Sequence, residues 1–180
     1  MIKLKGTKTE KNLMEAFANE SKSRNLYTYF ALQAREEGHE QIAAIFEETS
    51  NNEREHAKLW YKLLCEKEIP PTIENLRTAI SKENTEWTEM YKHMAADARA
   101  EGYNDIAFLF DSVGAIEMKH EARYRKLLEG FEGKSSSTKT EKSVWICRSC
   151  GYIADNEKAP PICPVCNHSQ MSFELRIVNY

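Results

Sequence analysis

Two long stretches of the chain repeat one pattern of apolar and polar positions. Inward-facing positions recur at alternating steps of four and three residues. In the first stretch they are Ile42, Phe46, Thr49, Glu53, His56, Trp60 and Leu63, and in the second they are Ile106, Phe110, Val113, Glu117, His120, Tyr124 and Leu127. This spacing is typical of the seam of a helix in a bundle. In both stretches a Glu and a His occupy the middle of the seam, where apolar residues belong.

The same periodicity predicts two further helices, each with a Glu inside its apolar face. Their inward positions are Leu13, Ala16, Glu20, Tyr27 and Ala31 in one, and Ile73, Leu76, Ile80, Glu83, Trp87, Met90 and Met94 in the other. The first helix is expected from about Thr9 to Gly38, the second ends near Glu68 before two prolines, and the others cover about residues 72–102 and 104–130. Residues 1–132 are therefore predicted to form an all-α four-helix bundle.

The motif Glu-x-x-His occurs twice, at Glu53–His56 and Glu117–His120. Residues three apart share a face of a helix, so each motif aims a carboxylate and an imidazole at one point. A buried carboxylate without a partner is costly, and a bound metal removes that cost. Two such motifs, joined by a Glu from each of two other helices, form the di-metal site of ferritin-like bundles. The sequence therefore predicts a site of this kind.

The predicted ligand set has five carboxylates and two imidazoles. It consists of Glu20, Glu53, Glu83, Glu86, Glu117, His56 and His120. Five negative charges against two divalent cations leave one net negative charge, and hard oxygen ligands with imidazole suit iron or manganese. One Glu-x-x-His alone is more often a solvated helix face, but two copies on inward seams argue against that interpretation. The neighbouring charged residues are expected to face solvent: Glu47, Glu48, Arg54, Glu55, Lys119 and Glu121.

Two Cys-x-x-Cys pairs follow near the C-terminus. Their cysteines are Cys147, Cys150, Cys163 and Cys166, and this spacing is a strong signature of a tetrathiolate metal site. Gly151 and Asn167 come directly after the pairs and suit the positive φ that such knuckles commonly adopt. Residues 144–180 are too few to fold by core burial alone, so metal ligation is expected to supply folding energy. The spacing leaves zinc and iron open.

A polar, Ser-rich segment at residues 133–143 is predicted to be a flexible linker between the bundle and the small domain. The fifth cysteine, Cys65, has no partner in either pair. We expect it to be a half-buried free thiol at the end of a helix.

The connection between the second and third helices is short, because only a few residues around Pro70 and Pro71 separate them. Ferritin-like bundles have a long crossover at this point. Two interpretations stay open. Either the start of the third segment is extended rather than helical, or helices are exchanged between two chains.

Composition narrows the class of protein. The 180 residues carry a net charge of −3, with 29% charged residues, so no basic surface for nucleic acid is expected. No apolar run is long enough for a membrane span. The short, charged N-terminus lacks the apolar segment of a secretion signal, and cysteine pairs of metal type fit a reducing compartment. We therefore expect a cytoplasmic protein without nucleic-acid or membrane partners.

The order of the bundle ligands and the cysteine pairs resembles that of the rubrerythrin family over nearly the whole chain. The resemblance implies a ferritin-like di-iron bundle followed by a rubredoxin-like domain that holds one iron on its four cysteines. It also implies that Glu53 and Glu117 bridge the two irons, while Glu20 and Glu83 are terminal ligands.

Further roles are implied by the same resemblance. Glu86 and His56 would exchange on one iron as it changes oxidation state, and His120 would hold the other iron. Tyr27 and Tyr91 would donate hydrogen bonds to ligating carboxylates.

The activity implied is that of a non-haem peroxidase, which reduces hydrogen peroxide to water in oxidative stress defence. Electrons would come from NADH through a donor protein, a reductase or a rubredoxin, and a homodimer is expected, with or without exchanged helices. Two alternatives use the same motifs. One is a ferroxidase or iron-handling bundle that does not need the cysteine pairs, and the other is a metal-binding bundle with a structural zinc ribbon. Iron on the cysteines would give a red protein and zinc a colourless one.

Overall fold

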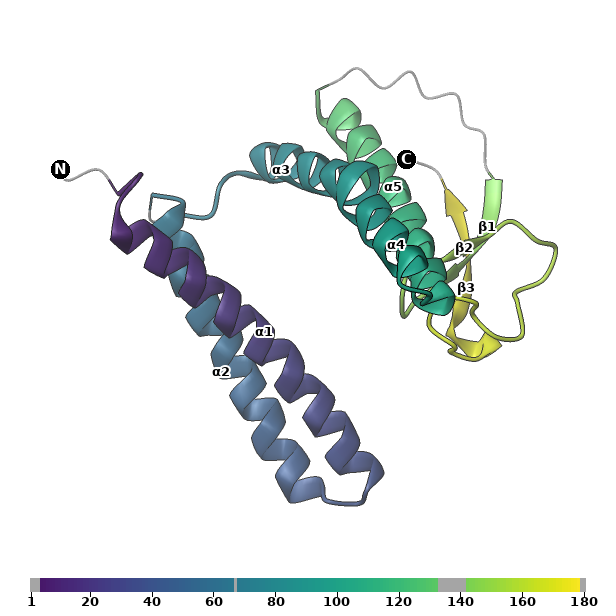
Figure 1. The fold of residues 1–180 in the computed structure, drawn as a ribbon, viewed down its shortest axis with the longest axis horizontal. Helices are drawn as coiled ribbons and strands as arrows, with labels where there is room; N and C mark the ends of the chain where they lie inside the picture. Colours follow the sequence, from purple (N-terminus) through teal and green to yellow (C-terminus); the bar gives the residue numbers. More distant parts are fainter. Residues whose placement is uncertain (1–3, 67, 133–141, 179–180) are drawn as a thin grey trace. The chain divides into compact units, whose positions relative to one another are not determined.

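The computed structural model describes residues 4–66, 68–132 and 142–178. The chain divides into two compact units, Met1–Pro70 and Pro71–Tyr180, and each is described by itself (Figure 1). Residues 133–141 of the predicted linker lie outside the described residues. Among the helices that are described, none is long and apolar enough to cross a membrane.

The first unit is a hairpin of two long helices, α1 (Lys8–Glu36) and α2 (Glu40–Leu64). The Thr7 side chain accepts a hydrogen bond from the backbone N–H of Glu10 and so caps α1, two residues before the predicted start. Gly38 ends α1 with a left-handed φ of 81°, a conformation that glycine adopts without strain. The second helix ends at Leu64, earlier than the predicted Glu68.

Small residues form the seam between α1 and α2. They are Ala31 and Ala34 on α1, and Ala43, Ser50 and Ala57 on α2. The Ser50 hydroxyl donates to the Arg24 carbonyl oxygen at 2.9 Å and lies 2.9 Å from the Thr28 hydroxyl. Small side chains let the two backbones approach closely, and the hydroxyl has its hydrogen bonds satisfied inside the seam.

The second unit begins with a helical hairpin whose first arm is interrupted. Its elements are α3 (Thr72–Thr85), the π-helical segment η1 (Glu86–Met90), α4 (Tyr91–Ala100) and α5 (Asn104–Phe131). The sequence predicts one continuous helix from Thr72 to Gly102, so the π-helical turn was not anticipated. The predicted alternative of an extended start is wrong, because α3 is helical from Thr72 onward.

The C-terminal part of this unit is a small antiparallel sheet of three strands in the order β2-β1-β3. The strands are β1 (Lys142–Cys147), β2 (Ile153–Ala154) and β3 (Phe173–Val178). A 3-10 turn, η2 (Gln170–Ser172), leads into β3. The core of this domain is built around the cysteines, together with Ala154, Ala159 and Phe173. So small a core is consistent with a fold that depends on a metal.

Candidate metal centres

The first hairpin brings together three of the predicted ligands. Glu20 on α1 lies beside Glu53 and His56 on α2, and one ligand atom from each falls within 4.8 Å of the others. His56 Nδ1 is 3.0 Å from the Glu53 carboxylate and 3.9 Å from that of Glu20. The carboxylates are largely covered, whereas the His56 side chain is 51% exposed. The histidine side of this triad is therefore exposed in the single chain.

The two adjacent carboxyl groups of this triad favour a bound cation. A hydrogen bond with Glu53 raises the pKa of Glu20, and burial and the charge of Glu53 add to the effect. The same hydrogen bond, followed by one with His56, lowers the pKa of Glu53. Two adjacent carboxylates repel each other, and a divalent cation between them would remove that repulsion.

The second hairpin repeats the arrangement with Glu83 on α3, and Glu117 and His120 on α5. His120 Nδ1 is 2.7 Å from the Glu117 carboxylate and 3.6 Å from Glu83 Oε2. Burial, followed by a hydrogen bond with Glu117, raises the pKa of Glu83. Glu83 Oε2 is buried and has no hydrogen-bond partner among the residues that the structure describes. A buried carboxylate oxygen without a partner is costly, and a metal ion would satisfy it.

Each triad offers two carboxylates and one imidazole, a donor set that suits iron or manganese. Six of the seven predicted bundle ligands thus fall into two groups of three, one in each unit.

Glu86, the seventh predicted ligand, belongs to neither triad. It begins the π-helical segment, and its carboxylate lies 3.4 Å from Lys82 Nζ with 22% of the side chain exposed. The exchange of Glu86 with His56 stays a prediction.

The π-helical segment adds one residue to the ligand-bearing arm of the second hairpin. Glu20 precedes Tyr27 by seven positions, whereas Glu83 precedes Tyr91 by eight. A π-helical turn accommodates one extra residue within an α-helix. The rest of the arm therefore keeps its register with α5.

The aromatic contacts confirm that register. The rings of Tyr27 and Phe46 lie 6.2 Å apart, and those of Tyr91 and Phe110 also lie 6.2 Å apart. Burial raises the pKa of Tyr91, and the charges of Glu117, Glu86 and Glu83 raise it further. Tyr91 is thus close to the second triad. The hydrogen bonds expected from Tyr27 and Tyr91 to ligating carboxylates stay predictions.

The expectation that Glu121 faces solvent is wrong. The residue is buried, with 6% of its surface exposed. Its carboxylate accepts hydrogen bonds from Asn84 Nδ2, Trp87 Nε1 and Arg125 Nε. Burial opposes the charge, but these three hydrogen bonds outweigh it and lower the pKa of Glu121. The network joins α5 to the start of the π-helical arm. Arg125, four residues later on the same helix, was the available sequence signal.

The other charged neighbours mostly behave as expected. Glu47, Glu48, Arg54 and Glu55 are exposed. Lys119 is the exception, since it is half-buried and burial lowers its pKa.

The four predicted cysteines come together in the small domain, with their sulfur atoms within 4.8 Å of one another. Cys147 Sγ is 3.7 Å from Cys166 Sγ, and Cys150 Sγ is 3.6 Å from Cys163 Sγ. A tetrahedral site with metal–sulfur bonds of about 2.3 Å has edges of about 3.8 Å, so the four sulfurs fit a single ion. Cys65 is free and half-buried, as predicted.

The two knuckles have the predicted backbone form. Gly151 and Asn167 adopt positive φ values of 78° and 57°. Burial opposes ionisation of Cys147, but hydrogen bonds from the backbone N–H groups of Cys150 and Ser149 outweigh it, and the pKa falls to about 7. Backbone N–H groups aimed at a sulfur stabilise the thiolate form that a metal needs.

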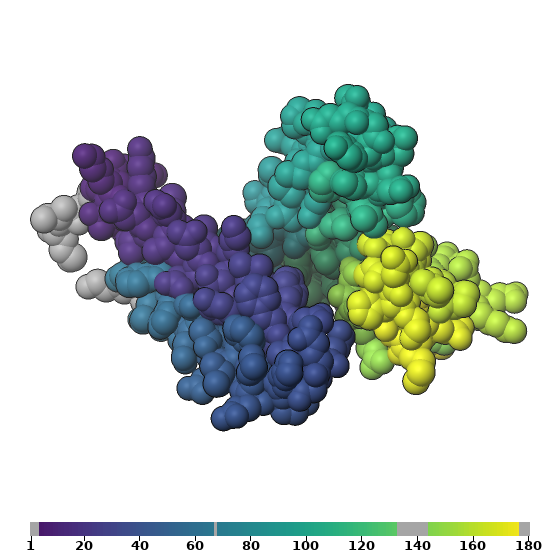
Figure 2. Space-filling view, turned by 60° about the horizontal axis from the view of Figure 1, so that its bottom comes forward, coloured from purple at the N-terminus to yellow at the C-terminus, as the bar shows by residue number. Residues whose placement is uncertain are grey.

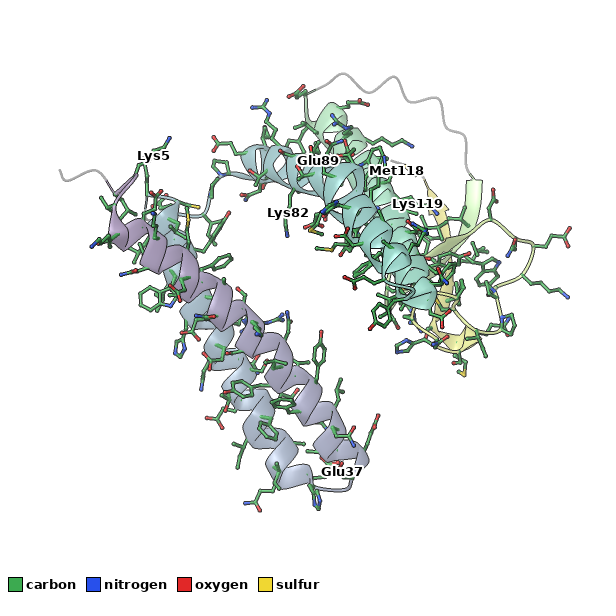
Figure 3. The ribbon with its side chains drawn as sticks, viewed as in Figure 1. Lys5, Glu37, Lys82, Glu89, Met118 and Lys119 are labelled. Carbon is green, nitrogen blue, oxygen red and sulfur yellow. The ribbon has the colours of Figure 1, made fainter. Side chains whose placement is uncertain are left out.

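The cysteine domain packs against α5 beside a predicted ligand (Figures 1 and 2). A Cβ atom added at Gly151 would meet His120 Nε2 and Ile116 Cγ2, each at 3.2 Å. Nearby is Lys119, which Figure 3 labels on α5, and its Nζ donates to the carbonyl oxygen of Ile153 at 3.4 Å. The ring of His120 thus has the Glu117 carboxylate at Nδ1 and a cysteine knuckle at Nε2.

Comparison with known proteins identifies the family of both domains. The rubrerythrin family model matches residues 11–128, and that of the rubrerythrin rubredoxin-like domain matches residues 145–174. Rubrerythrin of Porphyromonas gingivalis is 44% identical over 98% of this chain and 94% of its own length. Rubrerythrin-1 of Clostridium acetobutylicum and rubrerythrin of Nitratidesulfovibrio vulgaris are 42% and 39% identical, with full coverage of both chains. The chain therefore belongs to the rubrerythrin family, which holds two irons in a ferritin-like bundle and one iron in a rubredoxin-like domain.

Proposed function

We propose that this protein reduces hydrogen peroxide to water and draws the electrons through its own cysteine site. The observation that carries the proposal is the contact between a cysteine knuckle and His120, a member of the second triad. A bundle that only stores iron or oxidises it with oxygen has no need of a redox-type tetrathiolate site beside a ligand. The contact therefore favours electron transfer into the carboxylate centre.

In this proposal the two triads supply the ligands of one di-iron centre. Glu53 and Glu117, which each contact the second carboxylate and the histidine of their triad, would bridge the two irons, as the family resemblance implies. Glu20 and Glu83 would be terminal ligands. The resulting set is rich in hard oxygen donors and satisfies the buried Glu83 oxygen.

When bound, the two irons supply two electrons to the O–O bond, and the iron of the cysteine site replaces them one at a time. The reduction of one peroxide to two waters also needs two protons. Tyr91 holds a proton at Oη, because burial and the neighbouring carboxylates raise its pKa. Glu86 is partly exposed at the π-helical turn, so its carboxylate is accessible to solvent. It is also the group that we expect to alternate with His56 as a ligand.

His120 is the residue that we place between the two redox sites. Its Nδ1 faces the Glu117 carboxylate, where a ligated metal would sit, and its Nε2 faces the knuckle at Gly151. A ligating histidine commonly has its second ring nitrogen held by a neighbouring group. Here the ring edge at Nε2 lies against Gly151 of the cysteine domain, so the ring lies between the two sites.

The partners follow from this route. A donor protein, a reductase or a rubredoxin, delivers electrons that originate from NADH to the cysteine domain. Hydrogen peroxide is the substrate, the protein acts as a homodimer, and its compartment is the cytoplasm. The rubredoxin-like domain supports the first of these assignments, since such domains serve electron transfer.

A cysteine substitution tests the route. In Cys150→Ser protein, steady peroxide reduction with a protein donor should fall strongly, while the chemically reduced bundle should still be oxidised once by peroxide. Cys65→Ser removes a thiol outside the site and serves as the matched control. Unchanged turnover in Cys150→Ser protein would contradict the proposal and favour a structural role for the cysteine domain. Iron-dependent oxygen consumption without peroxide turnover would favour the ferroxidase alternative.

A further inference from the structure

The π-helical segment accommodates its extra residue after Glu86. The backbone N–H of Glu86 donates to the carbonyl oxygens of Glu83 and Lys82, three and four positions back, as in the last turn of an α-helix. The N–H of Tyr91 instead donates to the Glu86 carbonyl oxygen, five positions back. Glu83 and Glu86 therefore keep the spacing of an α-helix, and residues three apart share a face. The seventh predicted ligand thus lies on the face of the arm that carries Glu83.

The position of the extra residue decides where the Glu86 side chain points. Each residue of an α-helix turns the chain by about 100°. If the extra residue were accommodated between Glu83 and Glu86, the Glu86 side chain would point about 100° away from its present direction. Both positions need one wide turn of the backbone. The choice between them therefore comes from side-chain contacts.

Two side chains of the arm donate to one oxygen atom of α5. Asn84 Nδ2 lies 3.1 Å from Glu121 Oε2, and Trp87 Nε1 donates to the same atom. Asn84 and Trp87 are three positions apart, so they face one point only while the arm between them keeps its α-helical register. This span includes Glu86. The two hydrogen bonds therefore hold the register in which Glu86 lies on the face of Glu83.

The arm is fixed on the other side of the extra residue as well. A Cβ atom added at Gly114 of α5 would meet Tyr91 Cβ at 3.2 Å, so the start of α4 lies close against α5. The rings of Tyr91 and Phe110 are in contact, as described above. The extra residue is therefore confined between Trp87 and Tyr91.

Glu121 itself is held in place from its own helix. Arg125 Nε donates to Glu121 Oε1 at 2.7 Å, which leaves Oε2 for the two donors of the arm. The residue is buried but belongs to neither triad. Its carboxylate thus acts on the arm that carries Glu86.

We propose that Glu121 is a positioning residue for Glu86. By accepting hydrogen bonds from Asn84 and Trp87, it keeps the extra residue of the arm beyond Glu86 and holds the Glu86 carboxylate on the face of the second triad. The inference rests on the proposed di-iron site, in which Glu86 is the seventh ligand.

Four variants of the full-length, iron-loaded protein separate positioning from simple support of the fold. Glu121→Ala removes the acceptor of both arm bonds, and Trp87→Phe keeps an aromatic ring but removes one donor. Arg125→Met is the matched control, because it removes a bond to the same carboxylate and leaves both arm bonds in place. Glu121→Gln is the conservative variant, since its amide oxygen can still accept from Asn84 and Trp87.

The Mössbauer spectrum of the oxidised protein is the readout, because it distinguishes carboxylate-bound from thiolate-bound iron and changes with the ligands. We expect Glu121→Ala and Trp87→Phe to change the carboxylate-bound signal in the same way as Glu86→Ala, with both bundle irons retained. Turnover should fall by about 10–100-fold in Glu121→Ala protein. Arg125→Met and Glu121→Gln should give the wild-type spectrum.

Two results would overturn the inference, and they are distinguishable. If Glu86→Ala changes the spectrum but Glu121→Ala and Trp87→Phe do not, Glu121 supports the fold without positioning Glu86. If Glu86→Ala itself leaves the spectrum of the oxidised protein unchanged, the assignment of Glu86 as a ligand fails, and with it the part of the proposed function on which this inference rests.

Discussion

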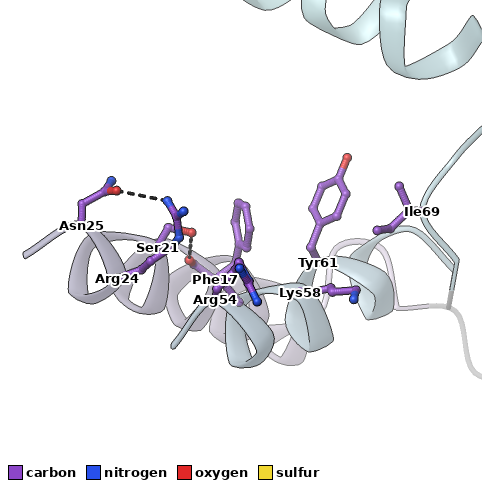
Figure 4. A pocket seen from close by; sticks show the side chains of 9 residues that line it. Phe17, Ser21, Arg24, Asn25, Arg54, Lys58, Tyr61 and Ile69 are labelled. Carbon is purple, nitrogen blue, oxygen red and sulfur yellow. Dashed lines mark hydrogen bonds between the residues drawn. The ribbon is translucent and has the colours of Figure 1, made fainter. Parts of the chain in front are cut away.

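The two helical hairpins carry the same triad of side chains, but the helices and the packing around the triad differ. In the first hairpin both arms are regular α-helices, and a pocket lined by Phe17, Arg54, Ala57 and Tyr61 opens on its surface (Figure 4). In the second hairpin the residue that matches Ala57 in the repeat is Glu121, which is buried in a polar network. One hairpin has open space at this position, and the other has three hydrogen bonds to a carboxylate.

The difference accompanies the extra residue of the second hairpin. Trp87, one of the donors to Glu121, lies inside the π-helical segment, and Asn84 lies just before it. The segment that carries Glu86 is therefore tied to α5 by this network. The first hairpin has neither the extra residue nor an extra carboxylate. A centre that took ligands from both hairpins would therefore be asymmetric, with one more ligand from the second hairpin.

Loss of either central glutamate should have the largest effect. Glu53→Ala or Glu117→Ala should lose both bundle irons and lower peroxide turnover by roughly 100-fold or more, since even residues behind a ligand cost about 10–100-fold. Glu55→Ala, an exposed change on the same helix, should leave both unchanged. Metal analysis and a peroxide assay measure the effect. Full bundle iron in either variant would mean that the bridging assignment is wrong.

Glu86→Ala probes the asymmetry directly. We expect two irons to remain in the reduced protein, because both triads are intact, and turnover to fall by about 10–100-fold. Glu89→Ala, an exposed change in the same π-helical segment, is the matched control. Crystal structures of the oxidised and reduced wild-type protein should show Glu86 on one iron in the first state and His56 in the second. Identical ligands in both states would refute the exchange.

Glu121→Ala should lower the stability of the second hairpin. Trp87 Nε1 and Asn84 Nδ2 would lose their acceptor, so we expect a loss of about 2–4 kcal/mol in the free energy of unfolding. Glu129→Ala, exposed on the same helix, should change it by less than about 0.5 kcal/mol. Denaturant unfolding of the metal-free proteins measures both. Equal stabilities would show that the network does not support the π-helical arm.

The pH dependence of this effect has a fixed sign. Because the pKa of Glu121 in the folded protein lies below its ordinary 4.5, its charge stabilises the fold above that pH. The stabilisation is lost as the pH falls through the folded pKa. The difference in stability between wild type and Glu121→Gln should therefore shrink below pH 4.5. A difference that grows on acidification would contradict the assignment.

The sequence identified the residues that meet in each triad and in the cysteine cluster, because these residues follow local rules. Glu53 and His56 share a helix face by spacing alone, and two Cys-x-x-Cys pairs converge around one ion. Burial of Glu121 could not be predicted in this way, because its partner Trp87 comes from another helix. The π-helical turn did leave a signal, the eight positions between Glu83 and Tyr91, but only the contacts showed how the extra residue is accommodated.

A single-turnover experiment tests the central claim most directly. The fully reduced protein is mixed anaerobically with peroxide in excess over the di-iron centres, without any electron donor, and the absorbance of the cysteine-bound iron is followed in a stopped-flow instrument. Each peroxide takes two electrons and each cysteine site holds one, so the wild-type protein can consume at most half an equivalent beyond the first. We predict that the ferric colour of the cysteine site appears as this further peroxide is consumed, and that Cys150→Ser protein stops after the first equivalent. A cysteine site that stays reduced while peroxide continues to disappear would contradict the account.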